Sequence, residues 1–368
     1  MSEQTKTVFV LGAGASHDVG APLVNNFLDE AWKLWKTGNI QPDQEKSFKR
    51  VFSALGELQR VHSKSKLNLN NLESVFSIFE MSSYLGHYFN EPDEGNRTTH
   101  ASEFVKALKE LIIVTLERSI KLPIANGNIT PMGSYVDFVK LVNRLRRKGQ
   151  PNHDVKIISF NYDLMLDLSF EKAGIGVDYG LKAYSSSRNP IPIYKLHGSL
   201  NWGVEEESNQ IIPWDFASYF SNRSYGYHTD GGYLTLGSHI LDGEFKKENE
   251  KIGKEVFLVP PTFNKTFNNK EIREVWRKAS KALSEAENLF IIGFSLPETD
   301  LFFKYLYALG TAGIDLFQRL WVFDPKPEGK EVDVKYKKLL GPGAELRYKY
   351  HPNRFDEAIK ILKEEFRV

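Results

Sequence analysis

Short apolar runs that stop at a glycine or a polar residue recur along this chain. The first spans residues 7–12 (TVFVLG) and is rich in β-branched and aromatic side chains. Comparable runs follow at residues 155–160, 193–196, 255–261, 289–292 and 320–323, and the more polar stretch at residues 345–351 (ELRYKYH) is predicted to be a further strand. Continuous apolar runs of this length are typical of strands that are buried on both faces of a parallel sheet.

A helical period replaces these runs after residue 22. Phe27, Leu28 and Ala31 recur three or four positions apart and would share one side of a helix over residues 23–38. Further helices are predicted at residues 43–62, 71–90, 101–122, 134–148, 268–286 and 354–366, with a loop at residues 90–100. The polar stretch at residues 203–255 predicts loops and a hairpin.

Strands that alternate with helices predict an α/β fold, a Rossmann-like and mostly parallel sheet with helices on both faces. The helical residues between the first two strands far exceed the dozen or so that one crossover needs. We therefore expect a single domain over residues 1–368, with a core of about 1–22 and 151–368. A large helical insertion or subdomain would occupy about 23–150.

Composition narrows the function classes. The 368 residues are 41% hydrophobic, enough for a substantial core, and 48 basic residues nearly balance 47 acidic ones. A net charge of +1 gives no field that would draw the chain to nucleic acid or a membrane, so we expect neither partner. The early charges of MSEQTKTVFV do not fit a signal peptide, and a cytoplasmic location is expected.

Several kinds of site are excluded by residue content. The chain has no cysteine, which rules out disulfides, cysteine nucleophiles and cysteine-based zinc sites. Its nine histidines form no H-E-x-x-H pair, so no metal is expected. No phosphate-binding G-x-x-x-x-G-K-[ST] loop and no G-x-S-x-G nucleophile turn appear.

Polar or glycine clusters follow five of the predicted strands. Ligands of doubly wound sheets bind beyond the carboxyl ends of the strands, so these clusters should converge on one crevice. Glycines there would let backbone amides approach a phosphate, although a purely structural turn explains them equally well. The clusters contain Gly12, Ala13, Gly14 and Ser16; Asn161 and Asp163; His197; Gly293 and Ser295; and Asp324.

In their order along the chain, the five clusters resemble the motifs of sirtuins and sirtuin-like NAD hydrolases. The matching stretches are GAGAS (12–16), FNYD (160–163), LHGSLNW (196–202), GFSLPETD (293–300) and VFDP (322–325). The resemblance implies that NAD is bound as the substrate. It does not extend over the helical segment or residues 203–255.

The resemblance also implies roles for individual residues. Asn161 would hold the nicotinamide ribose and the reacting water, His197 would be the general base, and Asp163 would bind the carboxamide. Each has a structural alternative. Asn161 would suit a helix N-cap, Asp163 a helix first turn, and His197 a buried hydrogen bond to a backbone carbonyl.

The remaining motif residues would hold the rest of the dinucleotide. Ser16 would bind phosphate, Ser295 phosphate or ribose, and Asp324 the adenosine ribose, since a carboxylate can accept two ribose hydroxyls. The bare backbone at the two turns would come from Gly12, Ala13, Gly14 and Gly293.

Two departures separate this chain from protein-deacylating sirtuins. The four-cysteine zinc module is missing, and Leu23-Val24-Asn25 stands where deacylases typically have Asp-Phe-Arg. The chain therefore resembles the sirtuin-like proteins that deplete NAD in bacterial antiphage defence. Some of these assemble with a HerA-type ATPase, and we expect a homo-oligomer.

The expected activity is cleavage of the nicotinamide–ribose bond of NAD+, an NAD+ glycohydrolase reaction that yields nicotinamide and ADP-ribose. Three alternatives stay open at this point. The chain could be an NAD-dependent protein deacylase, an ADP-ribosyltransferase, or a non-catalytic assembly subunit that binds NAD or ADP-ribose.

Overall fold

The computed structural model describes most of the chain, and every statement below concerns the described residues. These are residues 4–60, 67–95, 97–125, 128–130, 133–147, 153–182, 189–205, 208–213, 228–230, 233–235, 246–247, 250–259, 269–297, 301–310 and 317–368. Residues 214–227 and most of the predicted loop region around them lie outside these ranges. Within the described ranges, no helix is long and apolar enough to cross a membrane.

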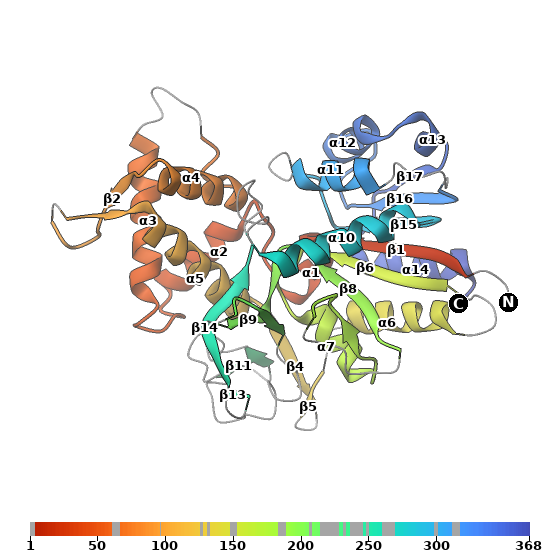
Figure 1. Ribbon diagram of the computed structural model, residues 1–368, viewed down its shortest axis with the longest axis horizontal. Helices are drawn as coiled ribbons and strands as arrows, with labels where there is room; N and C mark the ends of the chain where they lie inside the picture. Colours follow the sequence, from red (N-terminus) through yellow and green to blue (C-terminus); the bar gives the residue numbers. More distant parts are fainter. Residues whose placement is uncertain are drawn as a thin grey trace.

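A seven-stranded parallel sheet forms the centre of the molecule (Figure 1). β1 (Thr5–Leu11) lies in its middle, between β15 (Asn288–Ile292) and β6 (His153–Ser159). The sheet continues on the two sides with β16 (Arg319–Phe323) and β17 (Tyr348–His351), and with β8 (Ile191–Lys195) and β7 (Val177–Asp178). The prediction of an α/β, Rossmann-like fold is confirmed.

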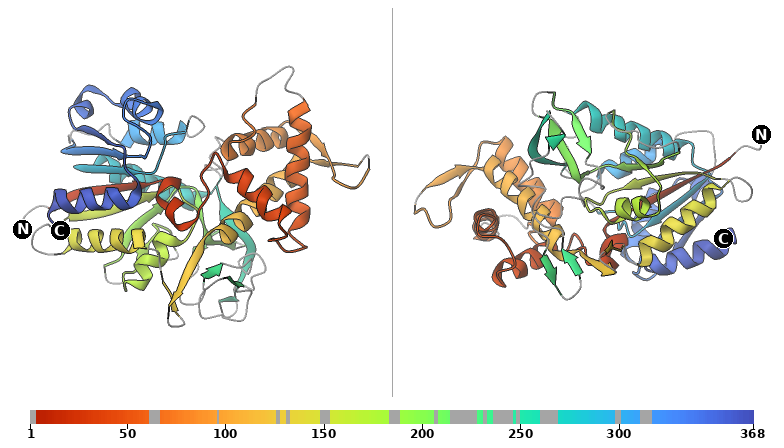
Figure 2. Two further views of the ribbon diagram at one scale, coloured as in Figure 1. Left: turned by 180° about the vertical axis from the view of Figure 1, so that it is seen from behind. Right: turned by 90° about the horizontal axis from the view of Figure 1, so that it is seen from below.

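Helices cover both faces of this sheet (Figure 2). α6 (Gly133–Arg146) and α14 (Phe355–Phe366) pack together on one face, and α10 (Lys270–Ser284) and α11 (Leu301–Gly310) pack together on the other. Alternate side chains of a strand point to the same face, which brings the Phe9 ring of β1 to 5.2 Å from the Phe138 ring of α6. α6 therefore covers the sheet, although it lies within residues 23–150.

Four amphipathic helices form a separate layer, which we call the helical block (Figure 1, left). They are α2 (Phe27–Lys36), α3 (Glu45–Arg60), α4 (Leu72–Tyr84) and α5 (Ala101–Ser119). α5 contacts the other three, and its buried apolar residues occur on most sides of the helix, as expected for a central helix.

The predicted helix over residues 71–90 is wrong at its C-terminal end. α4 stops at Tyr84, and Gly86 takes a positive φ of 72° that continues no helix. The chain then forms β2 (Tyr88–Asn90), which pairs with β3 (Thr98–His100). The predicted loop over residues 90–100 therefore includes the end of β2 and all of β3 as well as the turn between them.

The strand predicted at residues 193–196 is β8, and a second strand that the sequence did not predict follows it closely. β9 (Gly198–Glu205) leaves the parallel sheet and pairs with β14 (Glu250–Leu258) and β10 (Ile211–Pro213). Gly198 makes this change of direction with a φ of +83°, and a Cβ there would lie 2.2 Å from the Phe257 carbonyl oxygen. His197 occupies the short break between β8 and β9.

Candidate active site

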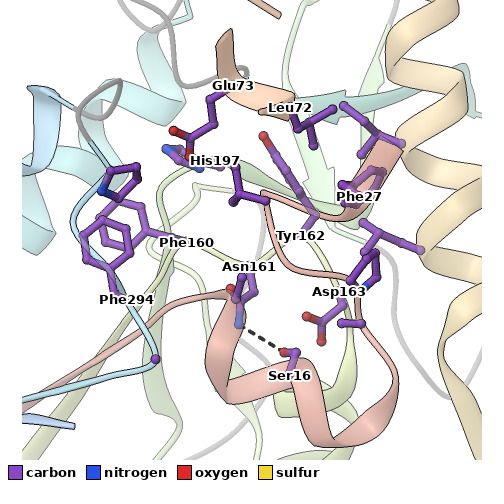
Figure 3. Close-up of a pocket in the computed structure, with 18 of the residues that line it drawn as sticks. Ser16, Phe27, Leu72, Glu73, Phe160, Asn161, Tyr162, Asp163, His197 and Phe294 are labelled. Carbon is purple, nitrogen blue, oxygen red and sulfur yellow. Dashed lines mark hydrogen bonds between the residues drawn. The ribbon is translucent and has the colours of Figure 1, made fainter. Parts of the chain in front are cut away.

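The carboxyl ends of the central strands open into two adjoining pockets between the sheet and the helical block. The space within them is about 820 Å³ for the inner pocket and about 1100 Å³ for the outer pocket, including space that is open to solvent. Both are lined by Ala13, Val24, Gly293, Ser295 and Pro297, so they meet at this wall. Figure 3 shows the inner pocket.

Three glycines bring two turns into close contact behind the shared wall, and one of them, Gly293, lines both pockets. Gly293 has a φ of +64°, and a Cβ there would lie 2.4 Å from the Ala15 nitrogen. A Cβ on Gly12 or Gly14 would likewise lie 2.6–2.7 Å from the Gly293 backbone. The Gly14 amide donates to the Gly293 carbonyl at 2.8 Å, so close packing of two turns is one reason for these glycines.

Asn161 is held by a hydrogen-bond network that starts at the first turn. Its Nδ2 donates to the Gly12 carbonyl at 2.9 Å and to Ser16 Oγ at 3.1 Å (Figure 3). Because Gly12 O can only accept, the amide nitrogen must face the turn, and the amide oxygen is turned away from it. α7 (Met165–Lys172) has its N-cap at Leu164, so Asn161 is not the helix cap that the sequence allowed.

Tyr135 of α6 completes this network, and the sequence analysis missed it. Its hydroxyl lies 2.6 Å from Ser16 Oγ, where α6 passes under the first turn. Burial, with a smaller contribution from the Asp163 charge, raises the pKa of Tyr135 well above its ordinary value. The phenol is therefore neutral. Nothing in the local sequence marks it, because a helical tyrosine on an apolar face ordinarily packs in a core.

Asp163 is buried beside Ser16, at the floor of the inner pocket. Its Oδ1 accepts the Met165 amide at 3.0 Å, and it lines the pocket as well. Asp163 precedes the N-cap of α7, whose first turn contains Asp167 instead, so Asp163 is not the first-turn residue that the sequence allowed. Burial raises the pKa of Asp163, and the positive charge of Lys195 opposes that shift. Lys195 itself is 1% exposed and pairs with Asp167 at 3.0 Å behind the pocket wall.

His197 lines the inner pocket from the β8–β9 break. The residue is 6% exposed, and its ring packs edge-on against Phe160 at 5.2 Å. Burial lowers the pKa of His197 to about 4, and a hydrogen bond to the Phe160 backbone opposes this. The imidazole is therefore neutral at physiological pH, with one nitrogen donating to that carbonyl and the other able to accept a proton.

Asp324 lines the outer pocket, at the end of β16. Its Oδ1 accepts the Lys326 amide at 3.0 Å, and burial raises its pKa above the ordinary range. Lys326 and Arg354 line the same pocket and supply positive charge, which the sequence analysis missed. Arg354 follows β17, so the rule that ligands bind at strand ends would have found it had it been applied to the last strand.

The predicted site residues are thus largely brought together. Asn161, Asp163, His197 and Ser16 line the inner pocket, and Gly14 and Asp324 line the outer one. Ala13, Gly293 and Ser295 line both. Gly12 is not among the lining residues and acts through its carbonyl, which accepts from Asn161.

The helical block supplies the opposite wall of the inner pocket, which the sequence analysis did not foresee. This wall consists of Phe27 of α2, Leu72, Glu73 and Phe76 of α4, and Ile112 and Leu116 of α5. An amphipathic helix predicts a buried face but not the surface against which it packs, so no sequence signal identified these residues.

No group of three or more His, Cys, Asp or Glu side chains that could hold a metal ion occurs among the described residues. The polar side chains of the two pockets carry amide, hydroxyl, imidazole and carboxyl groups, together with the amine of Lys326 and the guanidinium of Arg354. Their chemistry suits hydrogen bonding to sugar hydroxyls, amides and phosphates.

No protein-family model matches the sequence, and the comparison with curated proteins found no match. Solved structures titled as Sir2 proteins are similar. A Sir2–p53 peptide–NAD+ structure is 13% identical with a TM-score of 0.41, covering 98% of this chain and 92% of that chain. A Sir2 homolog–NAD complex is 13% identical with a TM-score of 0.36 (98% and 89% covered). Because these TM-scores are low, the function proposed below depends on the pockets and the sequence motifs.

Proposed function

We propose that this chain binds NAD+ across the two pockets and hydrolyses its nicotinamide–ribose bond. One observation carries the proposal: the inner pocket, with Asn161 and His197, shares a wall with the outer pocket, which contains Asp324. A dinucleotide has two nucleoside ends joined by a pyrophosphate, and this arrangement offers one pocket to each end.

In the proposed binding mode, Asp324 accepts hydroxyls of the adenosine ribose in the outer pocket. The pyrophosphate lies along the wall formed by Ala13, Gly293 and Ser295, within the field of Lys326 and Arg354. The nicotinamide riboside enters the inner pocket. There Asp163 faces the carboxamide, and the Asn161 amide oxygen accepts a ribose hydroxyl or orients water.

In the proposed reaction, the C1′–N bond breaks and its electron pair stays with the nicotinamide nitrogen, which becomes neutral. The ribose C1′ gains oxocarbenium character, and a water oxygen bonds to it. The water becomes strongly acidic as this bond forms, so a neutral imidazole of low basicity can accept its proton. His197 then releases that proton to solvent, and ADP-ribose and nicotinamide leave.

The hydrolase is favoured over the deacylase by the apolar wall that the helical block adds to the inner pocket. Water needs little room beside the scissile bond, whereas an acyl-lysine side chain needs a channel to it. The absence of a cysteine zinc module in the sequence favours the same choice.

Two further parts of the proposal concern the assembly. We propose that the chain acts as an NAD-depleting effector in antiphage defence, as a homo-oligomer that can associate with a HerA-type ATPase. The sequence resemblance supports this. So do four exposed apolar residues where α4 ends and β2 begins, Met81, Tyr84, Leu85 and Tyr88, which are 57–77% exposed and could form subunit contacts.

The test is incubation of the purified chain, alone and in its oligomeric form, with NAD+ and separation of the products. We expect nicotinamide and ADP-ribose in equal amounts, with no dependence on an acyl-lysine peptide. His197→Gln and Asn161→Ala should each lower the rate by about 100-fold or more. His153→Gln is the matched control, because His153 is also buried but bonds to Thr7 at the far end of the sheet. Full turnover by His197→Gln would contradict the proposal.

A further inference from the structure

The helical block contributes a carboxyl group to the inner pocket that the reaction above does not use. Glu73 lies in the first turn of α4 and lines the pocket that also contains Asn161 and His197. The residue is 8% exposed, so its side chain is enclosed by the walls of the pocket and its surroundings. In Figure 3 its side chain extends from α4 toward the side of the pocket where His197 lies.

The start of α4 is fixed, so Glu73 has a defined position. The Asn71 side chain caps the helix by accepting the Ser74 amide at 2.9 Å. The Leu72 amide donates to the Val24 carbonyl at 3.3 Å and ties the helix to the segment that follows the first turn of the site. The wall that carries Glu73 is thereby connected to the wall that carries Ser16.

The wall that carries Glu73 is otherwise apolar. It also contains Leu72, Phe76, Ile112 and Leu116, and apolar residues reduce the screening of charges in a pocket. Among the described lining residues of the inner pocket, the other carboxyl group is Asp163.

We infer that Glu73 is a substrate-recognition residue whose carboxylate binds the cationic nicotinamide riboside of NAD+. The inference rests on the proposed function and adds the feature that selects the oxidised nucleotide. NAD+ carries a positive charge on its pyridinium ring, whereas ADP-ribose and the reduced nucleotide lack it. When the C1′–N bond breaks, this charge passes to the ribose, and the same carboxylate stabilises it there.

The experiment compares two ligands by calorimetry. One is carba-NAD+, in which a methylene replaces the ring oxygen of the nicotinamide ribose so that it is not cleaved, and the other is ADP-ribose. We expect Glu73→Gln to weaken carba-NAD+ binding about tenfold or more and to change ADP-ribose binding less than twofold. Glu73→Asp should recover part of the loss, because it keeps the charge.

Glu80→Gln is the matched control. It removes the same charge from the same helix, and Glu80 is not among the residues that line the pocket. Neither ligand should be affected by it. Thermal melting and circular dichroism of each variant report whether the fold is kept. If Glu73→Gln does not fold, the affinities of Glu73→Asp for the two ligands are compared instead.

Two outcomes separate this inference from the proposed function. Suppose that the unaltered chain binds carba-NAD+ and that Glu73→Gln binds both ligands with the same affinities as the unaltered chain. The inference is then overturned and the proposed function stands. Equal weakening of the two ligands would also overturn it, because Glu73 would then only shape the pocket. If the unaltered chain binds neither ligand, the proposed function and the inference fail together.

Discussion

At the scale of the residue, burial decides the charge of the groups proposed to act. His197 is buried within an aromatic surround, and its pKa of about 4 keeps the ring neutral where most histidines begin to titrate. The ring can therefore accept a proton over the whole physiological range, at the cost of low basicity. The same burial couples this residue to the stability of the fold.

We predict that His197 makes the fold less stable in acid. Its folded pKa lies below the unfolded value of about 6.5, so between pH 6.5 and about 4 the unfolded state binds a proton that the folded state excludes. Stability should fall by up to about 3 kcal/mol as the pH decreases through this window. Urea denaturation of the unaltered chain and of His197→Gln at pH 7, 5.5 and 4.5 would measure it. Parallel pH profiles for the two proteins would contradict the prediction.

Tyr135 gives a second prediction at this scale. Tyr135→Phe removes the hydroxyl that lies 2.6 Å from Ser16 Oγ and leaves Ser16 and Asn161 less well oriented. We expect kcat to fall about fivefold to tenfold with little change in KM, the effect of one hydrogen bond of about 1 kcal/mol. Tyr348→Phe is the control. It also loses a tyrosine hydroxyl bonded to a neighbour, Asp333 at 2.8 Å, but outside the pockets, so kcat should not change.

At the scale of the element, two turns after parallel strands form the wall between the pockets. The turn after β1 and the turn after β15 touch mainly through backbone atoms, with the Phe294 Cβ also close to Gly12. A side chain added there should destabilise the fold more than an ordinary replacement of a glycine of positive φ. The reason is that the neighbouring atoms belong to a backbone that is itself hydrogen-bonded and cannot easily move.

We predict that Gly293→Ala destabilises the fold by about 3 kcal/mol or more, since strain at positive φ adds to a backbone clash. Gly329→Ala is the matched control. Gly329 has a similar φ of +72°, but nothing lies within 4 Å of an added Cβ, so it should cost about 1 kcal/mol. Chemical denaturation of the two variants measures the difference, and equal costs would show that the two turns can move apart.

The same elements show how far the sequence could predict the structure. Apolar runs predicted β1, β6, β8, β15 and β16, because burial on both faces leaves a clear pattern, and β17 was predicted from the more polar stretch at residues 345–351. The end of β8 was also clear, but β9 was not, since its direction is set by pairing with β14 and not by local preference.

The site residues that follow strands could be predicted from the sequence, and those that lie on helices could not. Asn161, Asp163, His197 and Asp324 follow strands, and the topology brings the ends of parallel strands to one edge. Tyr135 and Glu73 come from helices whose buried faces look the same whether they meet a core or a pocket. Their place was therefore set by tertiary packing that the sequence pattern does not encode.

At the scale of the whole molecule, the site lies at the interface between the helical block and the sheet. The inner pocket takes one wall from α2, α4 and α5 and the other from the ends of the strands. A ligand that fills it must contact both layers, so its binding energy holds them together.

We predict that NAD+ protects both layers at once from hydrogen exchange. Saturation at about 100 times Kd should stabilise the fold by about 2.7 kcal/mol. In the His197→Gln variant, which limits turnover, exchange should slow at the start of α4 as well as in the turn at Gly14. The C-terminal half of α3, which does not line the pockets, is the internal control. Protection confined to the strand ends would contradict the prediction.

The break between β8 and β9 has a mechanical consequence. Leu196 is tied to the parallel sheet through its amide, which donates to Ser159 at 2.9 Å, while the His197 carbonyl accepts from Val259, just beyond β14, at 2.8 Å. His197 thus lies at the point where the backbone passes from the parallel sheet to the antiparallel sheet. If the antiparallel sheet tilts against the central sheet, the peptide at His197 must rotate. A force applied far from the pocket would then move the imidazole ring into or out of alignment with a ligand in the inner pocket.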